Sequence, residues 1–115
     1  RKELSKHKAV RPFLDKLFQP RKTWLVPEKE DTLVCRCEEV TVKDICKAIS
    51  TGAHSPDKIK SLTRCGMGPC QARMCGLSVS EIIADQRKIS PEDVGYFKIR
   101  SPLRPITLAQ LAGIK

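Results

Sequence analysis

The 115-residue chain has few aromatic residues and no long apolar segment. One Trp, one Tyr and three Phe are too few for the stacking surface on which single-stranded nucleic acids bind. Uninterrupted apolar runs extend over only a few residues, whereas a membrane-spanning helix needs about 20. These two absences argue against a nucleic-acid-binding protein and exclude a membrane-spanning segment in this sequence.

The sequence also lacks the motifs of a complete enzyme. It contains no Gly-x-Gly-x-x-Gly for FAD or NAD, and no Ser–His–Asp set or carboxylate pair in a recognisable frame. The segment Gly66-Met67-Gly68 is not followed by the Lys-Ser/Thr that completes a phosphate-binding loop. We therefore expect no catalytic site for a substrate within this chain.

Positive charge is concentrated near the N-terminus. The chain has 22 Lys and Arg against 13 Asp and Glu, a net charge of +9, and residues 1–22 hold eight of the basic residues but only two acidic ones. A nucleic-acid partner would depend almost wholly on this segment, so we expect none. Changes in composition predict a basic N-terminal arm or linker at 1–30, a cysteine-bearing domain at 31–90, and an extended C-terminal tail with a short helix at 91–115.

Helical periodicity and capping residues predict a mostly helical domain. Apolar residues recur on one face between residues 42 and 51, and Thr41 with Asp44 resembles a capping box at its start. Ser55 followed by Pro56 is typical of a second helix start. The predicted helices cover residues 42–51, 55–62, 71–88 and a short stretch from residue 107.

The basic arm contains one amphipathic patch. Four residues with the spacing of a single helical face occur before Pro20, which ends this predicted helix. Residues 24–26 precede Pro27 and are predicted to be an extended segment that packs on a neighbour. The residues of the patch are Phe13, Leu14, Leu17 and Phe18.

Six cysteines divide into one isolated residue and two groups. Cys46 lies on the apolar face of the predicted helix 42–51, so we interpret it as a small buried hydrophobic residue. The other five fall in two predicted loops, and such a concentration indicates either disulfides or a metal site. These loops are Cys35-x-Cys37 and Cys65-x4-Cys70-x4-Cys75.

Disulfides and zinc are the less favoured interpretations of these loops. Cys35 and Cys37 would point to opposite faces of an extended strand, so they would not bond to each other there. Structural zinc sites usually pair cysteines as C-x2–4-C, which makes C-x-C an unusual half-site. His7 and His54 have no partner at ligand spacing, and we expect both to be exposed.

An iron–sulfur cluster held by four thiolates is the third candidate. Residues five apart on a regular helix differ by about 140° around its axis, so Cys70 and Cys75 cannot converge from one helix. We therefore expect Cys70 to lie in the Gly-Pro loop before the helix, with Cys75 reaching back. Gly66 and Gly68 would let backbone N–H groups approach sulfur without a Cβ between them.

The two loops resemble those of the bacterioferritin-associated ferredoxin (BFD) family. The residues concerned are Val34-Cys-Arg-Cys-Glu-Glu-Val-Thr41 and Thr63-Arg-Cys-Gly-Met-Gly-Pro-Cys-Gln-Ala-Arg-Met-Cys-Gly76. Members of this family are small, all-helical domains that bind one [2Fe-2S] cluster. The resemblance implies an all-α, helix-turn-helix-like fold with cysteine-bearing loops and extended N- and C-terminal arms.

The resemblance also implies a ligand set. Carried over position by position, the cluster ligands are Cys35, Cys37, Cys70 and Cys75. The family spaces its second pair by two residues, whereas four residues separate Cys70 from Cys75 here. Because Cys65 and Cys70 have the same separation, Cys65 stays open as an alternative to Cys75.

The second loop and the tail at 90–108 are most similar to the C-terminal region of FAD-binding subunits of heteromeric amine and amino-acid dehydrogenases. Opine oxidase, hydrogen cyanide synthase and heteromeric proline dehydrogenase are of this type, and the resemblance covers residues 31–112. It implies a cytoplasmic electron-transfer domain, with any membrane contact made through the complex.

In that role the domain would relay electrons from FAD, located elsewhere in the parent protein or assembly, to a quinone or a soluble carrier. Its partners would be the flavin domain or other subunits. A zinc-stabilised or regulatory binding module without a redox role is the alternative.

Overall fold

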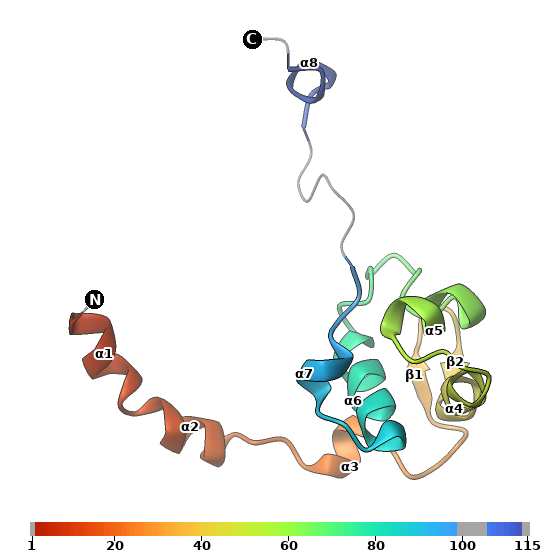
Figure 1. The fold of residues 1–115 in the computed structure, drawn as a ribbon, viewed down its shortest axis with the longest axis horizontal. Coiled ribbons are helices and arrows are strands. Elements are labelled where there is room, and N and C mark those ends of the chain that lie inside the picture. The colour runs from red at the N-terminus through yellow and green to blue at the C-terminus, as the bar shows by residue number, and fades with distance from the viewer. Residues whose placement is uncertain (1, 99–105, 114–115) are drawn as a thin grey trace.

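The computed structural model describes residues 2–98 and 106–113, which contain eight helices and one two-stranded sheet (Figure 1). As predicted, this part of the chain is mostly helical. None of its helices is long and apolar enough to cross a membrane. The elements are α1 Lys2–Lys8, α2 Arg11–Leu17, α3 Lys22–Leu25, β1 Leu33–Cys35, β2 Val40–Thr41, α4 Val42–Ser50, α5 Pro56–Thr63, α6 Gly76–Arg87, α7 Pro91–Val94 and α8 Leu108–Leu111.

Helices α4, α5 and α6 pack against one another and enclose the core (Figure 1). Ile45 of α4, Ile59 of α5 and Ile83 of α6 are fully buried. Burying one such side chain stabilises the fold by about 1.5–3 kcal/mol. The bounds of α4 and α5 confirm the predicted helices 42–51 and 55–62 to within one residue, because each begins directly after the predicted cap residue.

The start of α4 shows the predicted capping box. The Asp44 backbone N–H donates to Thr41 Oγ1 at 3.3 Å, and the Thr41 backbone N–H donates to Asp44 Oδ2 at 3.0 Å. Two backbone donors that the helix itself cannot satisfy are thereby paired. This box fixes the direction in which the chain passes from β2 into α4.

Strands β1 and β2 form a short antiparallel pair in which Cys35 lies opposite Val40. Between the strands the chain turns through Cys37 and Glu39, and Glu39 adopts a left-handed conformation with φ 53°. The turn sets Cys37 outside the ladder, so it need not point away from Cys35 as alternate strand residues do. The small sheet therefore positions both cysteines of the first loop.

Helix α6 begins at Gly76, so the predicted start at residue 71 is wrong. Gln71 and Ala72 have φ angles of 51° and 64°, in the left-handed region that a right-handed helix excludes. At Gly76 a Cβ atom would lie 2.0 Å from the Tyr96 hydroxyl oxygen, so only glycine fits there. Residues 71–75 thus belong to the cysteine loop. Cys70 also lies in this loop before the helix, as we expected from the spacing of Cys70 and Cys75.

The segment after α7 returns across the cysteine loop. The Tyr96 hydroxyl donates to the Ala72 carbonyl oxygen at 3.1 Å, and the Ser80 hydroxyl donates to the Gly95 carbonyl oxygen at 2.7 Å. Phe97 is 6% exposed and belongs to the same core as the central helices. The predicted extended stretch between this segment and α8 lies largely outside the described residues.

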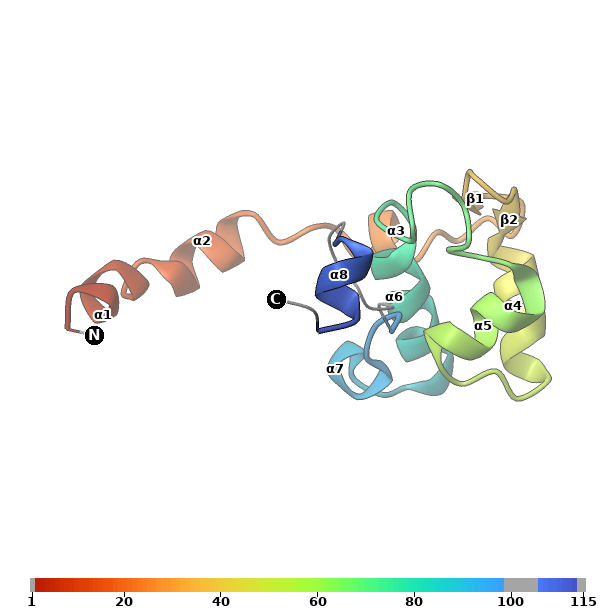
Figure 2. The same cartoon turned by 90° about the horizontal axis from the view of Figure 1, so that it is seen from above.

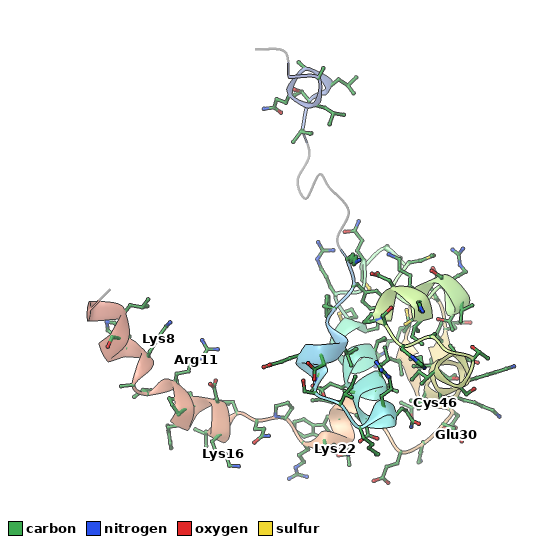
Figure 3. The ribbon with its side chains drawn as sticks, in the orientation of Figure 1. Lys8, Arg11, Lys16, Lys22, Glu30 and Cys46 are labelled. Atoms are coloured by element: carbon green, nitrogen blue, oxygen red, sulfur yellow. The ribbon has the colours of Figure 1, made fainter. Side chains whose placement is uncertain are left out.

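The N-terminal arm leaves the domain at α3 and extends away from it as α1 and α2 (Figures 1 and 2). Lys8, Arg11 and Lys16 are spread along these two helices (Figure 3). The helical patch predicted before Pro20 is confirmed by α2. The extended backbone predicted for residues 24–26 is wrong at its start, because Trp24 and Leu25 belong to α3.

Helix α3 is fastened to α6. Lys22 Nζ lies 2.5 Å from Asp85 Oδ1, and this ion pair lowers the pKa of Asp85 through a hydrogen bond and through charge. Val26, directly after α3, is half-buried against the core. The chain is therefore attached to the domain from about Lys22 onward, whereas α2 buries no residue.

Candidate metal centre

Three buried cysteines from three different elements meet in the core. The Sγ atoms of Cys35, Cys65 and Cys75 all lie within 4.8 Å of one another, and each residue is at most 1% exposed. Cys35 ends β1, Cys65 follows α5, and Cys75 is the residue that precedes α6. We call these three residues the inner group.

The backbone conformation at the end of α5 positions Cys65 in the inner group. Arg64 adopts a left-handed conformation with φ 63°, which ends the helix and reverses the chain. The Cys65 backbone N–H then donates to Thr63 Oγ1 at 3.2 Å. The cysteine is thus held by local geometry and points into the core instead of continuing along the helix.

Cys37 and Cys70 form a second group, here called the outer pair, of which Cys37 is exposed and Cys70 half-buried. Gly68 makes room for this pair, because a Cβ atom there would lie 2.1 Å from Cys37 Cβ and 3.0 Å from Cys37 Sγ. The absence of a Cβ atom at this glycine therefore lets the Cys37 side chain pack directly against the backbone. Any larger residue at position 68 would displace the Cys37 side chain.

The backbone around Cys70 favours a thiolate. Hydrogen bonds from the backbone N–H groups of Met74 and Ala72, together with one from Cys37, lower the pKa of Cys70. The left-handed residues 71 and 72 curl the loop so that these amides reach the sulfur. Both amides come from residues 71–75, which we predicted to be the start of a helix. The N–H groups near this sulfur are therefore not those of Gly66 and Gly68.

The pKa of Cys37 moves the other way. The Cys70 backbone N–H lowers it by donating to the Cys37 sulfur, but the side-chain hydrogen bond to Cys70, desolvation and the nearby Cys70 and Cys35 side chains outweigh that effect, so the pKa is raised. In the outer pair, the hydrogen bond between the two side chains therefore raises the pKa of Cys37 and lowers that of Cys70.

The inner group shows the same division between a raised and a lowered pKa. A hydrogen bond from Cys65, with a second from Cys35, lowers the pKa of Cys75 to about 6. The bond to Cys75 and burial raise the pKa of Cys65. Within the inner group, Cys75 is therefore the cysteine whose thiolate is most favoured, and a thiolate is the form in which cysteine binds metals.

Two of the arginines beside the cysteine loops make specific contacts. Arg64 Nε lies 2.9 Å from Glu38 Oε2, so its charge is matched with the carboxylate next to Cys37. Arg73 Nη1 donates to the Cys70 carbonyl oxygen at 3.2 Å and to Gln71 Oε1 at 3.0 Å. The Arg73 contacts therefore stabilise the turn that contains Cys70. The Arg64 charge offsets that of Glu38 beside the first loop.

Of the four cysteines predicted as ligands, Cys35 and Cys75 belong to the inner group together with Cys65, whereas Cys37 and Cys70 form the outer pair. The sequence leaves open whether Cys65 or Cys75 belongs to the set, and the inner group contains both. Cys46 lies apart on α4, near Glu30 (Figure 3), where it is half-buried and packs against the core. His54 is exposed, as expected.

The residues present fit a thiolate-bound metal centre. A tetrahedral zinc or an iron–sulfur cluster needs four ligands, and soft thiolates suit both. Five thiols, two of them with lowered pKa values, lie in two adjoining groups at the edge of the core. The fold and the site therefore define a small helical domain with a group of buried cysteines that could hold a metal.

The chain belongs to the sarcosine oxidase A3 domain family, which it matches over residues 29–114. It is 50% identical over 103 residues to the A subunit of opine oxidase from Agrobacterium tumefaciens (strain Ach5), covering 89% of this chain and 20% of that protein. It is 41% identical over 78 residues to the HcnB subunit of hydrogen cyanide synthase from Pseudomonas aeruginosa, covering 68% of this chain and 16% of that protein.

A more distant relative is the alpha subunit of sarcosine oxidase from Rhizobium meliloti (strain 1021), 28% identical over 95 residues, which cover 82% of this chain and 10% of that protein. The chain spans about one fifth of the length of the curated opine oxidase subunits it matches. Its similarity is therefore to one region of large oxidoreductase subunits.

Proposed function

We propose that the domain binds a [2Fe-2S] cluster through Cys35, Cys37, Cys70 and Cys75. The observation that carries this proposal is the meeting of an outer pair and an inner group of cysteines from two distant loops. A [2Fe-2S] cluster takes four cysteine thiolates, two on each iron. The outer pair offers two of them, and the inner group offers the other two.

Several features of the chain support a cluster over an empty thiol site. The amides of Met74 and Ala72 donate to Cys70, and hydrogen bonds of this kind stabilise the negative charge of a thiolate-bound centre. The space beside Gly68 leaves Cys37 free to reach a common centre with Cys70. When bound, a [2Fe-2S] cluster supplies one-electron chemistry between a reduced flavin and an acceptor such as a quinone or a soluble carrier.

The biological role that fits best is electron transfer in a multisubunit flavin-dependent amine or amino-acid dehydrogenase. The names of the relatives support an oxidoreductase role, and FAD would be bound outside this chain. Cys37 is exposed, so the centre reaches the surface where an electron donor or acceptor can approach. On this proposal residues 31–90 are the cluster-binding part.

The arm provides a docking segment for the remainder of such a protein. Phe13 and Leu17 of α2 are 65% and 60% exposed, and the curated relatives are about five times as long as the matched region. Burying this exposed apolar helix face against a partner surface would be favourable, because it would remove apolar area from water. The partner we propose is the flavin domain.

Anaerobic reconstitution with iron and sulfide tests the proposed cluster. We expect about two irons per chain, visible absorption that dithionite bleaches, and an EPR signal from the reduced chain. Cys37→Ser and Cys70→Ser should each lose iron, whereas the matched control Cys46→Ser should keep it. A colourless chain that holds a single zinc ion after the same treatment would support the zinc-stabilised module instead.

Deletion of residues 1–20 tests the docking role of the arm. The truncation ends before Lys22, so the ion pair between α3 and α6 is preserved. The cluster spectrum should be unchanged, while association with a separately produced flavin domain should weaken. Unchanged association would contradict the docking role, and a lost spectrum would show that the arm supports the cysteine site itself.

A further inference from the structure

We propose that Cys65 is a hydrogen-bond donor to the ligand sulfurs of the cluster and not a ligand itself. The inference rests on the proposed [2Fe-2S] site. That site has four ligand positions, while the inner group and the outer pair together hold five cysteines. One buried cysteine is therefore left without a ligand position, and its chemistry needs an explanation.

The proposed ligand set leaves Cys65 over. Cys35 is separated by one residue from Cys37, while Cys65 and Cys75 are each separated by four residues from Cys70, one on either side of it, and the proposed set takes Cys75. Cys65 reaches the site from the end of α5, on the far side of the Gly-Pro turn from Cys75. The two short loops can thus provide a complete ligand set without it.

Cys65 is also the most enclosed cysteine of the site. It is 0% exposed, and the next residue, Gly66, packs so closely under Phe97 that a Cβ atom would lie 3.1 Å from that ring. Its Sγ lies within 4.8 Å of the Sγ atoms of both Cys35 and Cys75. A thiol in this position has two ligand sulfurs as neighbours to which its S–H can donate.

Such a donor acts on the cluster through charge. A thiolate-ligated centre is negatively charged, and its charge grows when an electron is added, so a hydrogen bond to a ligand sulfur stabilises the reduced form more than the oxidised form. The S–H group is a weak donor, but burial strengthens its interaction with a charged sulfur. Cys65 is therefore a positioning residue that raises the reduction potential.

The test compares Cys65→Ala and Cys65→Ser in the reconstituted chain. Cys65→Ala should keep about two irons and the visible spectrum of the unmodified chain, while its midpoint potential shifts to a more negative value. Cys65→Ser retains a hydroxyl donor, so its potential should return toward that of the unmodified chain. Cys46→Ala is the matched control and should change neither iron content nor potential.

Three results would overturn the inference. Loss of iron in both Cys65 variants, with iron retained in Cys75→Ala, would make Cys65 a ligand. A shift of the visible spectrum in Cys65→Ser, as serine ligation produces, would do the same. A midpoint potential of Cys65→Ala equal to that of the unmodified chain would remove the hydrogen-bonding role while leaving the cluster proposal intact. An unmodified chain that takes up no iron would instead contradict the proposed function.

Discussion

Helix α4 in the domain and helix α2 in the arm both carry an apolar face at helical spacing, but only α4 buries it. Ile45 of α4 is 0% exposed because α5 and α6 lie against it, whereas Leu17 of α2 is 60% exposed. Amphipathic spacing therefore decides that a helix forms, and a neighbouring element decides whether its apolar face is buried. This difference is the reason for proposing a docking role for α2.

The largest expected effect separates these two helices directly. Ile45→Ala removes fully buried methyl groups and should lower the free energy of unfolding by about 2–5 kcal/mol. Leu17→Ala should change it by less than about 0.5 kcal/mol, because the side chain is exposed. Urea unfolding followed by circular dichroism measures both. A large loss in Leu17→Ala would mean that the arm folds onto the domain.

The second comparison is between two glycines of the domain. Gly68→Ala places a methyl group against Cys37, and we expect a loss of about 1–3 kcal/mol in unfolding free energy and a lower iron content after reconstitution. Gly52→Ala is the control, because nothing lies within 4 Å of a Cβ atom there, although its φ of +100° makes alanine strained. Both variants should lose stability, but only Gly68→Ala should lose iron.

The capping boxes of α4 and α8 provide a third comparison. Thr41→Ala should cost about 1 kcal/mol, because α4 belongs to the core. Thr107→Ala removes the same motif from α8, which buries no described residue, and should leave global unfolding unchanged. Equal losses in the two variants, measured by thermal unfolding, would show that α8 is part of the cooperative unit.

The Thr41 effect should also depend on pH. Hydrogen bonds from the Thr41 side chain and backbone hold the pKa of Asp44 below its ordinary value. A lowered pKa means that the contribution is complete above the unfolded pKa of about 4 and is lost as the pH falls through the folded value. The stability difference between Thr41→Ala and the unmodified chain should therefore shrink in acid. A constant difference down to low pH would exclude the carboxylate contribution.

The smallest expected effect concerns two ion pairs. Lys22→Ala breaks the contact with Asp85 that joins α3 to α6 and should cost about 0.2–1 kcal/mol. Arg11→Ala breaks a pair with Asp15 inside α2, in which both side chains are more than 60% exposed, and should have no measurable effect. Added salt should reduce the Lys22 effect further. Equal effects for the two variants would remove the distinction between α3 and the rest of the arm.

Local signals predict most of the helices but not the path of the second cysteine loop. Thr41, Ser55 and Thr107 each cap a helix as expected, because a cap depends on residues within one turn. The predicted start of α6 is too early, because Gln71 and Ala72 carry no glycine signal for their left-handed backbone. That conformation is stabilised by a distant residue, Tyr96, whose hydroxyl donates to Ala72.

The helical periodicity, the caps and the two cysteine loops follow from residues close together along the chain, so the sequence is sufficient to predict them. Which sulfur atoms meet depends on the packing of the helices. Cys35, Cys65 and Cys75 come from a strand end, a helix end and a helix start, and they converge because of the way α5 and α6 pack. Spacing along the chain measures separation in sequence, whereas a metal centre is defined by distances in space.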